Sequence, residues 1–554
     1  MVRHTTDEPV RLIPLGGLGE FGLNALVITH GEDSLLLDAG MLFPPAEMPG
    51  IDSIVPDFHY LAERASGLRG ILLTHGHEDH IGALSFALEA APAPVYGSRL
   101  TLGFVRARLS ERGVKADLRV LTPGVPVEIG PFRVHPIRVA HSVLDSLALA
   151  IETPAGVILG SGDFKMDETA PEDERTDAAA LAAWGEKGVL ALLSDSTGIE
   201  QHGRTGGEDS LRPAFEEVLA TTEGRVLVSC FATSIPRMQR VANLAFAAGR
   251  KVGFVGRRMV DNARIAQDLG LLRLPEGSVL DPSLDRDLPP DRTLLFVSGS
   301  QGEPLSALTA ISLGQHKDVF VGPGDSIVLS ARAIPGNERT VSRLISNLYR
   351  RHCDVFHPAS ARVHVSGHGS REDLAELLRL TRPRYFVPIH GEYRMLAQHA
   401  RLAVSTGIPS SRVLVAEDGD VLALSGEGAT REERIAAGRV LLDGGPGSEV
   451  DELVVRDRRH LSADGIVVPV IVLDRTTGRM ESAPEIVTRG VLDSEGRADL
   501  MEEAGRIVMD AVSQRETDET DIGITRERVR MELRRFFKKR MQKRPMVIPV
   551  VMEV

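Results

Sequence analysis

The sequence predicts an α/β protein of two to four domains, because 554 residues are too many for one hydrophobic core. Up to about residue 165, short apolar runs alternate with turns, which indicates mostly strands. From about residue 210, strands alternate with helices, which indicates a parallel sheet. The last ~90 residues are typical of a small separate α/β domain, which ends in MVIPVVMEV.

The first region contains eight apolar runs that most resemble strands, and few helices. One expected helix is GALSFALEAA, residues 82–91. The runs cover residues 10–15, 24–29, 34–40, 70–75, 94–98, 132–140, 147–153 and 156–163.

In the second region each strand is followed by a helix. The strands are expected over 224–230, 251–256 and 293–300, and the helices over 235–249, 259–270 and 303–314. Further on, the stretch ARVHVSGHG is expected to end a strand in a glycine-flanked loop. A helix is expected over 371–380 and a strand over 385–392. The polar stretch SGEGATREERIAAG, residues 425–438, is typical of a linker.

The composition is that of an ordinary soluble protein, with 42% apolar and 25% charged residues. No apolar run is long enough to span a bilayer, and the start, MVRHTTDEPV, has no apolar stretch like that of a signal peptide. Cys230 and Cys353 are the only cysteines, which excludes a disulfide framework. We therefore expect a cytoplasmic protein without a membrane partner.

The net charge of −13 argues mildly against a nucleic-acid partner, but it is unevenly distributed. Residues 526–544 contain ten Lys or Arg and two Glu, so this segment carries +8 and the remainder −21. A basic C-terminal segment can bind a polyanion. On charge alone, a solvated helix face explains it better.

The loop PLGGLGEFGLN contains Gly17, Gly19 and Gly22, which match the dinucleotide pattern G-x-G-x-x-G. That site needs a helix directly after the glycines, because the pyrophosphate binds at the helix N-terminus. Here the expected strand 24–29 follows instead. A tight glycine turn between two strands, close to the active site, is the better interpretation.

The stretch LLTHGHEDHIGAL, residues 72–84, predicts a metal site. It follows an apolar run and precedes a helix, so its side chains lie on a loop at the carboxyl end of a strand. Imidazoles and carboxylates are usual ligands of Zn²⁺ or Mn²⁺. His75 and His77 can share one ion, and Asp79 and His80 can reach a second.

Three further candidates follow other strands: His141 after 132–140, Asp163 at the end of 156–163, and His390 after the strand that starts at 385. Alone, each is more often a satisfied polar residue than a ligand. Together they complete two sets, with His75, His77 and His141 on one ion, Asp79, His80 and His390 on the other, and Asp163 bridging. A two-metal site can activate water and stabilise displacement at phosphorus. Asp38, in SLLLDAG, could orient a ligand imidazole or be a turn residue before Gly40.

The pattern H-x-H-x-D-H with later His, Asp and His resembles the metallo-β-lactamase superfamily. Asp163 and His390 are far apart, and the βα block between them resembles the β-CASP domain of nucleic-acid-cleaving members. Asp195 in LLSDSTG, His368 in VSGHGS and His390 in PIHGE match the extra motifs of that subfamily. The stretches PLGGLGEFG, DAGMLFPPAEMPGID, FATSIPRMQ, SGSQGEP and RPMVIPVVMEV are similar to the ribonuclease J family, end to end.

This resemblance implies a metallo-β-lactamase αββα sandwich, an inserted β-CASP α/β domain and a small C-terminal α/β domain. The expected bounds are 1–208 and 361–425 for the metallo-β-lactamase domain, 209–360 for the insertion, 426–462 for a linker and 463–554 for an assembly domain. The implied activity is 5′→3′ exoribonuclease on 5′-monophosphorylated single-stranded RNA, with some endonuclease activity, in RNA decay and rRNA or mRNA processing. Two Zn²⁺ per subunit, with Mn²⁺ or Mg²⁺ as activating metals, and a homodimer or homotetramer are implied, with other RNA-decay proteins as further partners.

By the same resemblance, His368 is the general acid and Asp195 its partner. The alternative is that His368 merely caps backbone groups on its loop. Ligands of open parallel sheets bind at the carboxyl ends of strands. Ser298, Gly299 and Ser300 end one such strand before Pro304, a good first helical residue, so their N–H groups could grip a phosphate. Ser234, His364 and Ser366 could complete a 5′-phosphate pocket, and ordinary serine capping is the alternative.

Three other functions use the same residues. A small-molecule hydrolase, such as a thioesterase or lactonase, would use the same metals, but the large insertion and the basic segment argue against it. The predicted ligands do not distinguish an RNA nuclease from a DNA nuclease of the same superfamily. A non-enzymatic RNA scaffold would bind RNA and leave it intact in the presence of metal.

Overall fold

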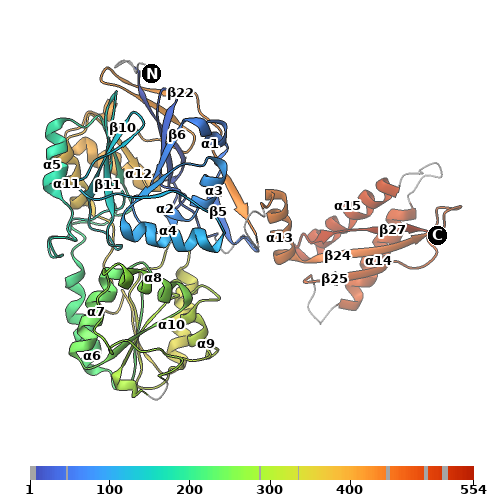
Figure 1. Cartoon of the computed structure of the whole chain (residues 1–554). Helices are drawn as coiled ribbons and strands as arrows, with labels where there is room; N and C mark the ends of the chain where they lie inside the picture. The colour runs from blue at the N-terminus through green and yellow to red at the C-terminus, as the bar shows by residue number, and fades with distance from the viewer. Residues whose placement is uncertain are drawn as a thin grey trace. The chain divides into compact units, whose positions relative to one another are not determined.

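The computed structural model describes residues 8–44, 48–285, 288–334, 336–443, 449–491, 497–513 and 522–554 (Figure 1). The chain forms two compact units. One comprises the residues up to 42 together with 54–440, and the other comprises 43–53 and 441–554. In the part of the chain that the structure describes, no helix combines the length and the apolar character that a bilayer crossing requires.

The core of the first unit is a sandwich of two sheets. One sheet has the order β22 (Ala429–Glu432), β21 (Val421–Leu424), β1 (Val10–Gly16), β3 (Ala25–His30), β4 (Asp33–Leu37), β6 (Leu68–Leu72), β7 (Val95–Gly97) and β8 (Leu118–Val120). The other has the order β19 (Tyr385–Ile389), β13 (Ala191–Asp195), β12 (Gly156–Gly160), β11 (Leu147–Thr153), β10 (Phe132–Arg138) and β9 (Val127–Ile129). Alternate residues of both sheets, such as Leu12, Ile28, Leu149 and Ile151, fill the space between them.

Helices cover the outer faces of the sandwich. The residues of the second sheet that point away from the first, such as Ala150 and Phe386, lie against α5 (Ala178–Lys187), α11 (Arg371–Thr381) and α12 (Tyr393–Ser405). On the other side, α4 (Arg99–Glu111) contacts β7 and β8, and α3 (Leu84–Ala90) contacts α1 (His59–Glu63). The expected αββα sandwich is confirmed.

The inserted domain is built on a five-stranded sheet whose pairings are all parallel, as the alternating pattern predicted. Its order is β15 (Lys251–Val255), β16 (Thr293–Val297), β14 (Val226–Ser229), β17 (Ser326–Leu329) and β18 (Asp354–Phe356). Its helices are α6 (Arg212–Thr221), α7 (Ile235–Ala247), α8 (Arg257–Asp268), α9 (Ala307–Leu313) and α10 (Glu338–Arg350).

The expected start of α9 at Pro304 is wrong. The helix begins at Ala307, because the side chain of Ser306 accepts a hydrogen bond from the N–H of Thr309 and caps it there. Pro304 lies in the preceding turn. Residues 298–300 therefore follow β16 without lying at the first turn of a helix.

The second unit is a small α/β domain. Its sheet joins β24 (Ile466–Leu473) to β25 (Glu485–Arg489), β26 (Met546–Val547) and β27 (Val550–Glu553). The helices are α13 (Glu452–Asp464), α14 (Arg497–Ser513) and α15 (Ile522–Met541), and Val508 of α14 and Phe537 of α15 share an apolar core with Ile471 of β24. Along β24, buried and half-buried residues alternate, so its opposite face, with Ile466, Val468, Val470 and Val472, remains half-exposed.

Two segments differ from the expected local structure. The polar stretch expected to be a linker contributes β22 to the edge of the first sheet, and Arg431 and Arg434 each lie 3.2 Å from the buried carboxylate of Asp420. A strand end is expected within residues 361–369, but these residues form no strand. Their carbonyls are bonded by side chains instead, as when the hydroxyl of Ser330 donates to Val363 O at 2.6 Å.

Candidate metal centre

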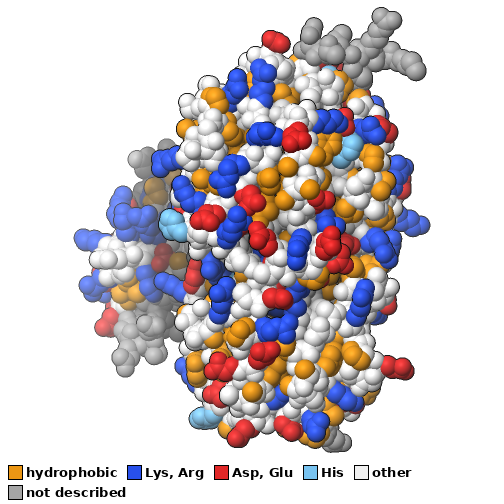
Figure 2. All heavy atoms as spheres, turned by 90° about the vertical axis from the view of Figure 1, so that its left-hand side faces the viewer, with side chains coloured by type: hydrophobic (Ala, Val, Ile, Leu, Met, Phe, Trp, Pro, Cys, Tyr) orange, Lys and Arg blue, Asp and Glu red, His pale blue; other side chains and the backbone are white. Residues whose placement is uncertain are grey.

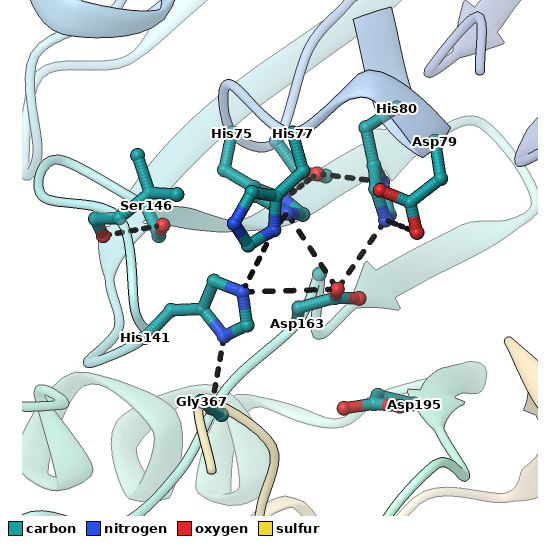
Figure 3. A network of polar contacts seen from close by, with 12 residues as sticks. His75, His77, Asp79, His80, His141, Ser146, Asp163, Asp195 and Gly367 are labelled. Carbon is teal, nitrogen blue, oxygen red and sulfur yellow. Dashed lines mark hydrogen bonds and ion pairs between the residues drawn. The ribbon is translucent and has the colours of Figure 1, made fainter. Parts of the chain in front are cut away.

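The loops that follow four strands of the sandwich bring the predicted ligands together. His75 and His77 lie between β6 and α2 (Glu78–Ile81), and Asp79 and His80 lie on the first turn of α2. The loops after β10, β12 and β19 supply the remaining members: His141, Asp163 and His390. Figure 3 shows the imidazoles of His75, His77, His80 and His141 gathered around the carboxylate of Asp163.

The predicted ligand atoms form two sets that share Asp163, and a third group of possible ligand atoms joins Asp163 and His390 to Asp195 and His368. In each set, the ligand atoms lie within 4.8 Å of one another. One set contains His75, His77, His141 and Asp163, and the other contains Asp79, His80, Asp163 and His390. The two sets have the members that the sequence predicted, and their role as metal ligands stays a prediction.

The first set converges on Nδ1 of His77. That nitrogen lies 3.0 Å from Nε2 of His75 and 3.2 Å from Nε2 of His141. Oδ2 of Asp163 lies 3.5 Å from His75 Nε2 and 3.9 Å from His141 Nε2. Three ring nitrogens and a carboxylate oxygen make a donor set that Zn²⁺ commonly takes.

The second set lies on the other side of the same carboxylate. Oδ2 of Asp163 is 3.3 Å from His80 Nε2 and 3.7 Å from His390 Nε2. His390 Nε2 is also 3.2 Å from Oδ2 of Asp79. Two imidazoles and two carboxylates again suit a divalent cation.

The shared oxygen itself indicates that cations fit here. Oδ2 of Asp163 is buried, and no group in the described part of the chain donates a hydrogen bond to it. A buried carboxylate oxygen without a donor is costly unless a charge compensates it. A cation on each side of this oxygen would supply that compensation.

Hydrogen bonds at the far side of each ring aim the ligand nitrogens into the centre. Nδ1 of His80 donates to Asp38 Oδ2 at 2.8 Å, and Nδ1 of His141 donates to the carbonyl of Gly367 at 2.8 Å. Nδ1 of His390 lies 2.6 Å from the hydroxyl of Thr197. In the neutral ring, a donating Nδ1–H leaves Nε2 of His80 and of His141 with a lone pair toward the centre, which is how ligand histidines are usually oriented.

Asp38 lies in a turn of the chain and also contacts the predicted ligand His80. Its φ of 60° is left-handed, and its Oδ1 accepts the N–H of Thr74 at 2.8 Å. Sequence reasoning did not identify Thr74, Thr197 or the carbonyl of Gly367. For Thr197 a signal existed, because the residue follows Asp195 by two positions in SDSTG.

The histidines of the first set are poor bases. Burial holds the pKa of His75 and of His141 well below the ordinary value, and neighbouring imidazoles lower both further. Burial also lowers the pKa of His77 to about 4, although Asp79 and Asp163 oppose it. Their rings are therefore neutral near pH 7, the form that ligates metals.

The second set has the opposite electrostatic character. Burial disfavours charge on His80 and His390, but the carboxylates around them outweigh it and raise the pKa of both well above the ordinary value. Asp163 is the largest of these influences on each ring. Burial likewise opposes charge on Asp79, yet His80 and His390 hold its pKa below the usual range.

His368 and Asp195 lie beside both sets. Nδ1 of His368 donates to Asp195 Oδ2 at 2.8 Å and lies 3.8 Å from Asp163 Oδ2. Burial opposes charge on the ring, but Asp195 and Asp163 prevail and raise its pKa. The hydrogen bond fixes the proton on Nδ1, so Nε2 is the nitrogen that a substrate can meet.

The residues predicted for a phosphate pocket lie along the carboxyl edge of the inserted sheet. Ser298, Gly299 and Ser300 follow β16, Ser234 lies at the N-cap position of α7 after β14 without a side-chain capping bond, and Nδ1 of His364 lies 3.3 Å from the carbonyl of Ser330 after β17. Ser234 is 1% exposed, and its hydroxyl has no partner within the described residues. The N–H of Ser298 is not free for a phosphate, because it donates to Val255 O at 3.0 Å. The hydroxyl of Ser366 accepts the N–H of His368, two residues further along the same segment, at 3.0 Å.

The glycine loop is a turn between strands, as expected. β3 follows it, and Gly17, Gly19 and Gly22 all have φ between 82° and 93°. Leu18 and Gly19 form β2, which pairs with β20 (Gly391–Glu392) directly after His390. The loop therefore supports the centre from one side.

Four family models match the chain. The metallo-beta-lactamase superfamily matches residues 18–197, and the ribonuclease J beta-CASP domain matches residues 223–348. The Zn-dependent metallo-hydrolase RNA specificity domain matches residues 359–413, and the ribonuclease J C-terminal domain matches residues 453–554.

Curated relatives match over nearly the whole chain. Ribonuclease J of Synechocystis sp. is 37% identical over 99% of this chain and 87% of its own length. Ribonuclease J2 of Bacillus subtilis is 36% identical over the full length of both proteins. A crystal structure of a protein of unknown function from Enterococcus faecalis is similar in fold, with a TM-score of 0.52, 14% identity, and coverage of 75% of this chain and all of that one.

Proposed function

The chain belongs to the ribonuclease J family and is a metal-dependent RNA hydrolase, and we propose that it degrades single-stranded RNA from a 5′-monophosphorylated end. The direction is 5′→3′, with some endonucleolytic cleavage, and the role lies in RNA decay and in rRNA and mRNA processing in the cytoplasm. The observation that carries the proposal is the pair of ligand sets that meet at Asp163 beside His368. The RNA specificity domain at 359–413 favours RNA over DNA or a small ester.

Two divalent cations fit the two sets, with Zn²⁺ as the resident metal and Mn²⁺ or Mg²⁺ as activating metals. His75, His77 and His141 would hold one, Asp79, His80 and His390 the other, and Asp163 both. Bound there, the cations supply the Lewis acidity that makes a nucleophile of water and offsets charge at phosphorus. Asp38 and Thr197 hold His80 and His390 in place for this purpose.

His368 is the proposed general acid. The bond that breaks joins phosphorus to the ribose 3′-oxygen, which needs a proton as it leaves. Nε2 of His368 would give that proton, while Asp195 stabilises the ring through Nδ1. The phosphate stays on the shortened RNA, so each cleavage leaves a new 5′-monophosphate and the next turnover meets the same chemical end.

The 5′-phosphate pocket is proposed at Ser234, Ser298, Gly299, Ser300, His364 and Ser366. The unpartnered hydroxyl of Ser234 supports it, because a buried donor without a partner costs roughly 1–3 kcal/mol. A monophosphate would fill this space, a triphosphate brings more charge to desolvate, and a 5′-hydroxyl leaves the donors unpaired. Figure 2 shows that basic and acidic side chains are interspersed over the side that bears α5 and α6, so end recognition cannot depend on one broad basic face there.

Assembly into a homodimer or homotetramer is proposed for the C-terminal domain. The half-exposed face of its sheet, with Val468, Val470 and Val472, continues into Val550 and Met552, which are 36% and 46% exposed. An apolar sheet face of this kind is stabilised by a second copy. Basic residues of α15 could also contact RNA phosphates.

The deciding experiment combines substrates with one variant. RNAs that differ only at the 5′ end, a matched DNA and a thioester are incubated with the wild type and with Asp79→Ala. We expect the wild type to digest 5′-monophosphate RNA fastest, and Asp79→Ala to lose hydrolysis while RNA binding, which comes mainly from phosphate contacts, persists. Near-normal turnover by Asp79→Ala with unchanged metal content would refute the two-metal site, and preferred cleavage of DNA or thioester would refute the substrate.

A further inference from the structure

One buried arginine outside the metal centre connects four separate segments of the first unit. Arg237, on the first turn of α7, is 2% exposed, and all five of its guanidinium N–H groups are used. Nε and Nη2 bind the two carboxylate oxygens of Glu208 at 3.0 and 2.7 Å. Nη2 also donates to Val365 O at 2.9 Å, and Nη1 donates to Ser330 O at 2.7 Å.

The fifth bond reaches the proposed phosphate pocket. Nη1 of Arg237 lies 3.0 Å from Nδ1 of His364. A guanidinium only donates, so Nδ1 must be the acceptor, and the single proton of the neutral ring is then on Nε2. The contact of Nδ1 with Ser330 O, at 3.3 Å, is longer, and that carbonyl already accepts from the same Nη1.

The carboxylate that holds Arg237 is itself anchored. Glu208 is 5% exposed, and its N–H donates to Oδ2 of Asp167 at 3.2 Å. Lys165 Nζ lies 3.5 Å from Asp167 and 4.0 Å from Glu208. Four buried charges of both signs thus compensate one another, which is the condition under which such a group is tolerated.

This network explains why residues 361–369 form no strand. The carbonyl of Val365 is bound by Arg237 instead of a neighbouring strand, and Val363 O is bound by Ser330. His364 and His368 lie on this one segment, at its pocket end and at its hydrolytic end. The position of Arg237 therefore determines how His364 meets a ligand.

We propose that Arg237, held by Glu208, is a positioning residue for 5′-end recognition: it fixes His364 as the Nε2–H tautomer, which donates to the 5′-phosphate of the RNA. The inference rests on the proposed function of the pocket. Burial, helped by the charge of Arg237, lowers the pKa of His364 to about 3, so the ring stays neutral and donates through one defined nitrogen.

The test compares Arg237→Lys with Arg240→Lys. Lysine keeps the charge opposite Glu208 but lacks the planar fork that reaches His364. Arg240 lies one turn further along α7 and pairs with Glu174 at 3.0 Å and Asp209 at 3.1 Å, so it is the matched control. The substrates are a 5′-monophosphate RNA, a 5′-hydroxyl RNA and a circular RNA, which has no end and reports the hydrolytic centre alone.

We expect Arg237→Lys to lower the preference for the 5′-monophosphate about tenfold, mainly through KM, the size of one lost hydrogen bond to a charged group. Cleavage of circular RNA should change less than about threefold, and Arg240→Lys should retain the preference. His364→Gln should show a similar loss, and the double variant Arg237→Lys/His364→Gln no larger one. An unchanged preference in Arg237→Lys, an equal loss on all three RNAs, or additive losses in the double variant would each overturn the inference.

The experiment distinguishes a failure of 5′-end recognition from a failure of the proposed role of Arg237. If the wild type showed no preference among the three RNAs, the proposed 5′-end recognition itself would be refuted. If Arg237→Lys cleaved none of the RNAs, Glu208→Gln would decide by the same criterion, because it keeps Arg237 and removes only one anchoring charge. A preference that Glu208→Gln leaves unchanged would refute the role of the network.

Discussion

Single hydroxyl and carbonyl groups decide how the ligand rings of the centre are oriented. Thr197 contacts Nδ1 of His390, and Gly367 O contacts Nδ1 of His141, across 193 and 226 residues of sequence. Neither group would bind a cation itself. Removing one of these contacts leaves every predicted metal ligand in place but lets the imidazole ring rotate. The effect on metal affinity then measures the contribution of ring orientation alone.

For Thr197→Val we expect the metal affinity to fall about 10- to 100-fold, with activity restored when the metal concentration is raised. Titration against a chelating indicator measures this. Thr222→Val is the control, because Thr222 also makes two buried hydrogen bonds, to Val218 O and Ser326, but lies away from the centre. Equal effects of both substitutions on metal affinity would contradict the orienting role.

A second residue, His399, gives the first unit a sensitivity to acid. Its ring is fully buried against Phe386 and contacts the hydroxyl of Ser196 at 3.1 Å. Burial lowers the pKa of His399 to about 3, although the charge of Asp195 opposes the shift. Below the unfolded value of ~6.5 the unfolded chain binds a proton that the folded chain refuses, so stability falls as the pH drops from about 6.5 toward 3.

The substitution His399→Gln should therefore reduce the acid sensitivity. Between pH 7.5 and 5.5 the wild type should lose about 1.4 kcal/mol more stability than the variant, as one proton per molecule over one unit below 6.5 requires. Urea unfolding of the first unit, followed at the two pH values, measures the difference. His59→Gln, at an exposed position, should behave like the wild type, and an identical pH response of His399→Gln would exclude the effect.

At the scale of elements, α11 begins directly after the loop of His368. Ser370 and Asp373 form a capping box at its start, with Ser370 N–H donating to Asp373 Oδ2 at 2.9 Å. The helix packs its apolar face on the second sheet. Its first turn therefore fixes one end of the segment that carries the proposed general acid.

Ser370→Ala should lower the free energy of unfolding of the first unit by about 1 kcal/mol, the usual effect of losing an N-cap. It should also lower the rate on every RNA alike, since the cap lies on the hydrolytic side of the segment. Ser370→Thr, which keeps the hydroxyl, should restore both. A variant that retains full stability and rate after losing the cap would show that other contacts, such as that of Thr205 with His368 O at 2.8 Å, suffice.

For the whole molecule, the division into two units determines where the chain can be shortened. A cut after residue 460 would divide α13 (Glu452–Asp464), whereas a chain ending at Val450 removes that helix entire. All proposed ligands lie between His75 and His390, in the first unit. We expect the shortened protein to sediment as a smaller species and still to cleave a short RNA, and an unchanged oligomer would contradict assembly through the C-terminal domain.

Much of this architecture follows from local patterns in the sequence. Strand and helix periodicity identified the sandwich strands and the parallel sheet, and the motif at 75–80 indicated a metal because its ligands are neighbours. Part of what escaped depends on distant partners and part on local bonds that the periodicity does not show. The strand expected within 361–369 is replaced by bonds to Arg237, the start of α9 is set by Ser306 rather than Pro304, and β22 is held by Asp420. Arg237 and Val365 are 128 residues apart, so no window of sequence contains both, whereas Ser306 lies only three residues before Thr309, the residue whose N–H it accepts.

The place of the insertion has a consequence during synthesis. β13 and β19 are neighbours in the second sheet, yet 190 residues separate Asp195 from Tyr385. On a ribosome that adds 5–20 residues per second, β13 remains an unpaired edge for about 10–40 s. Such an edge invites pairing with other chains, so the folding of the insertion and the early covering of this edge should limit aggregation. Until His390 has emerged the proposed metal centre is also incomplete, so we expect the nascent chain not to cleave the message from which it is being translated.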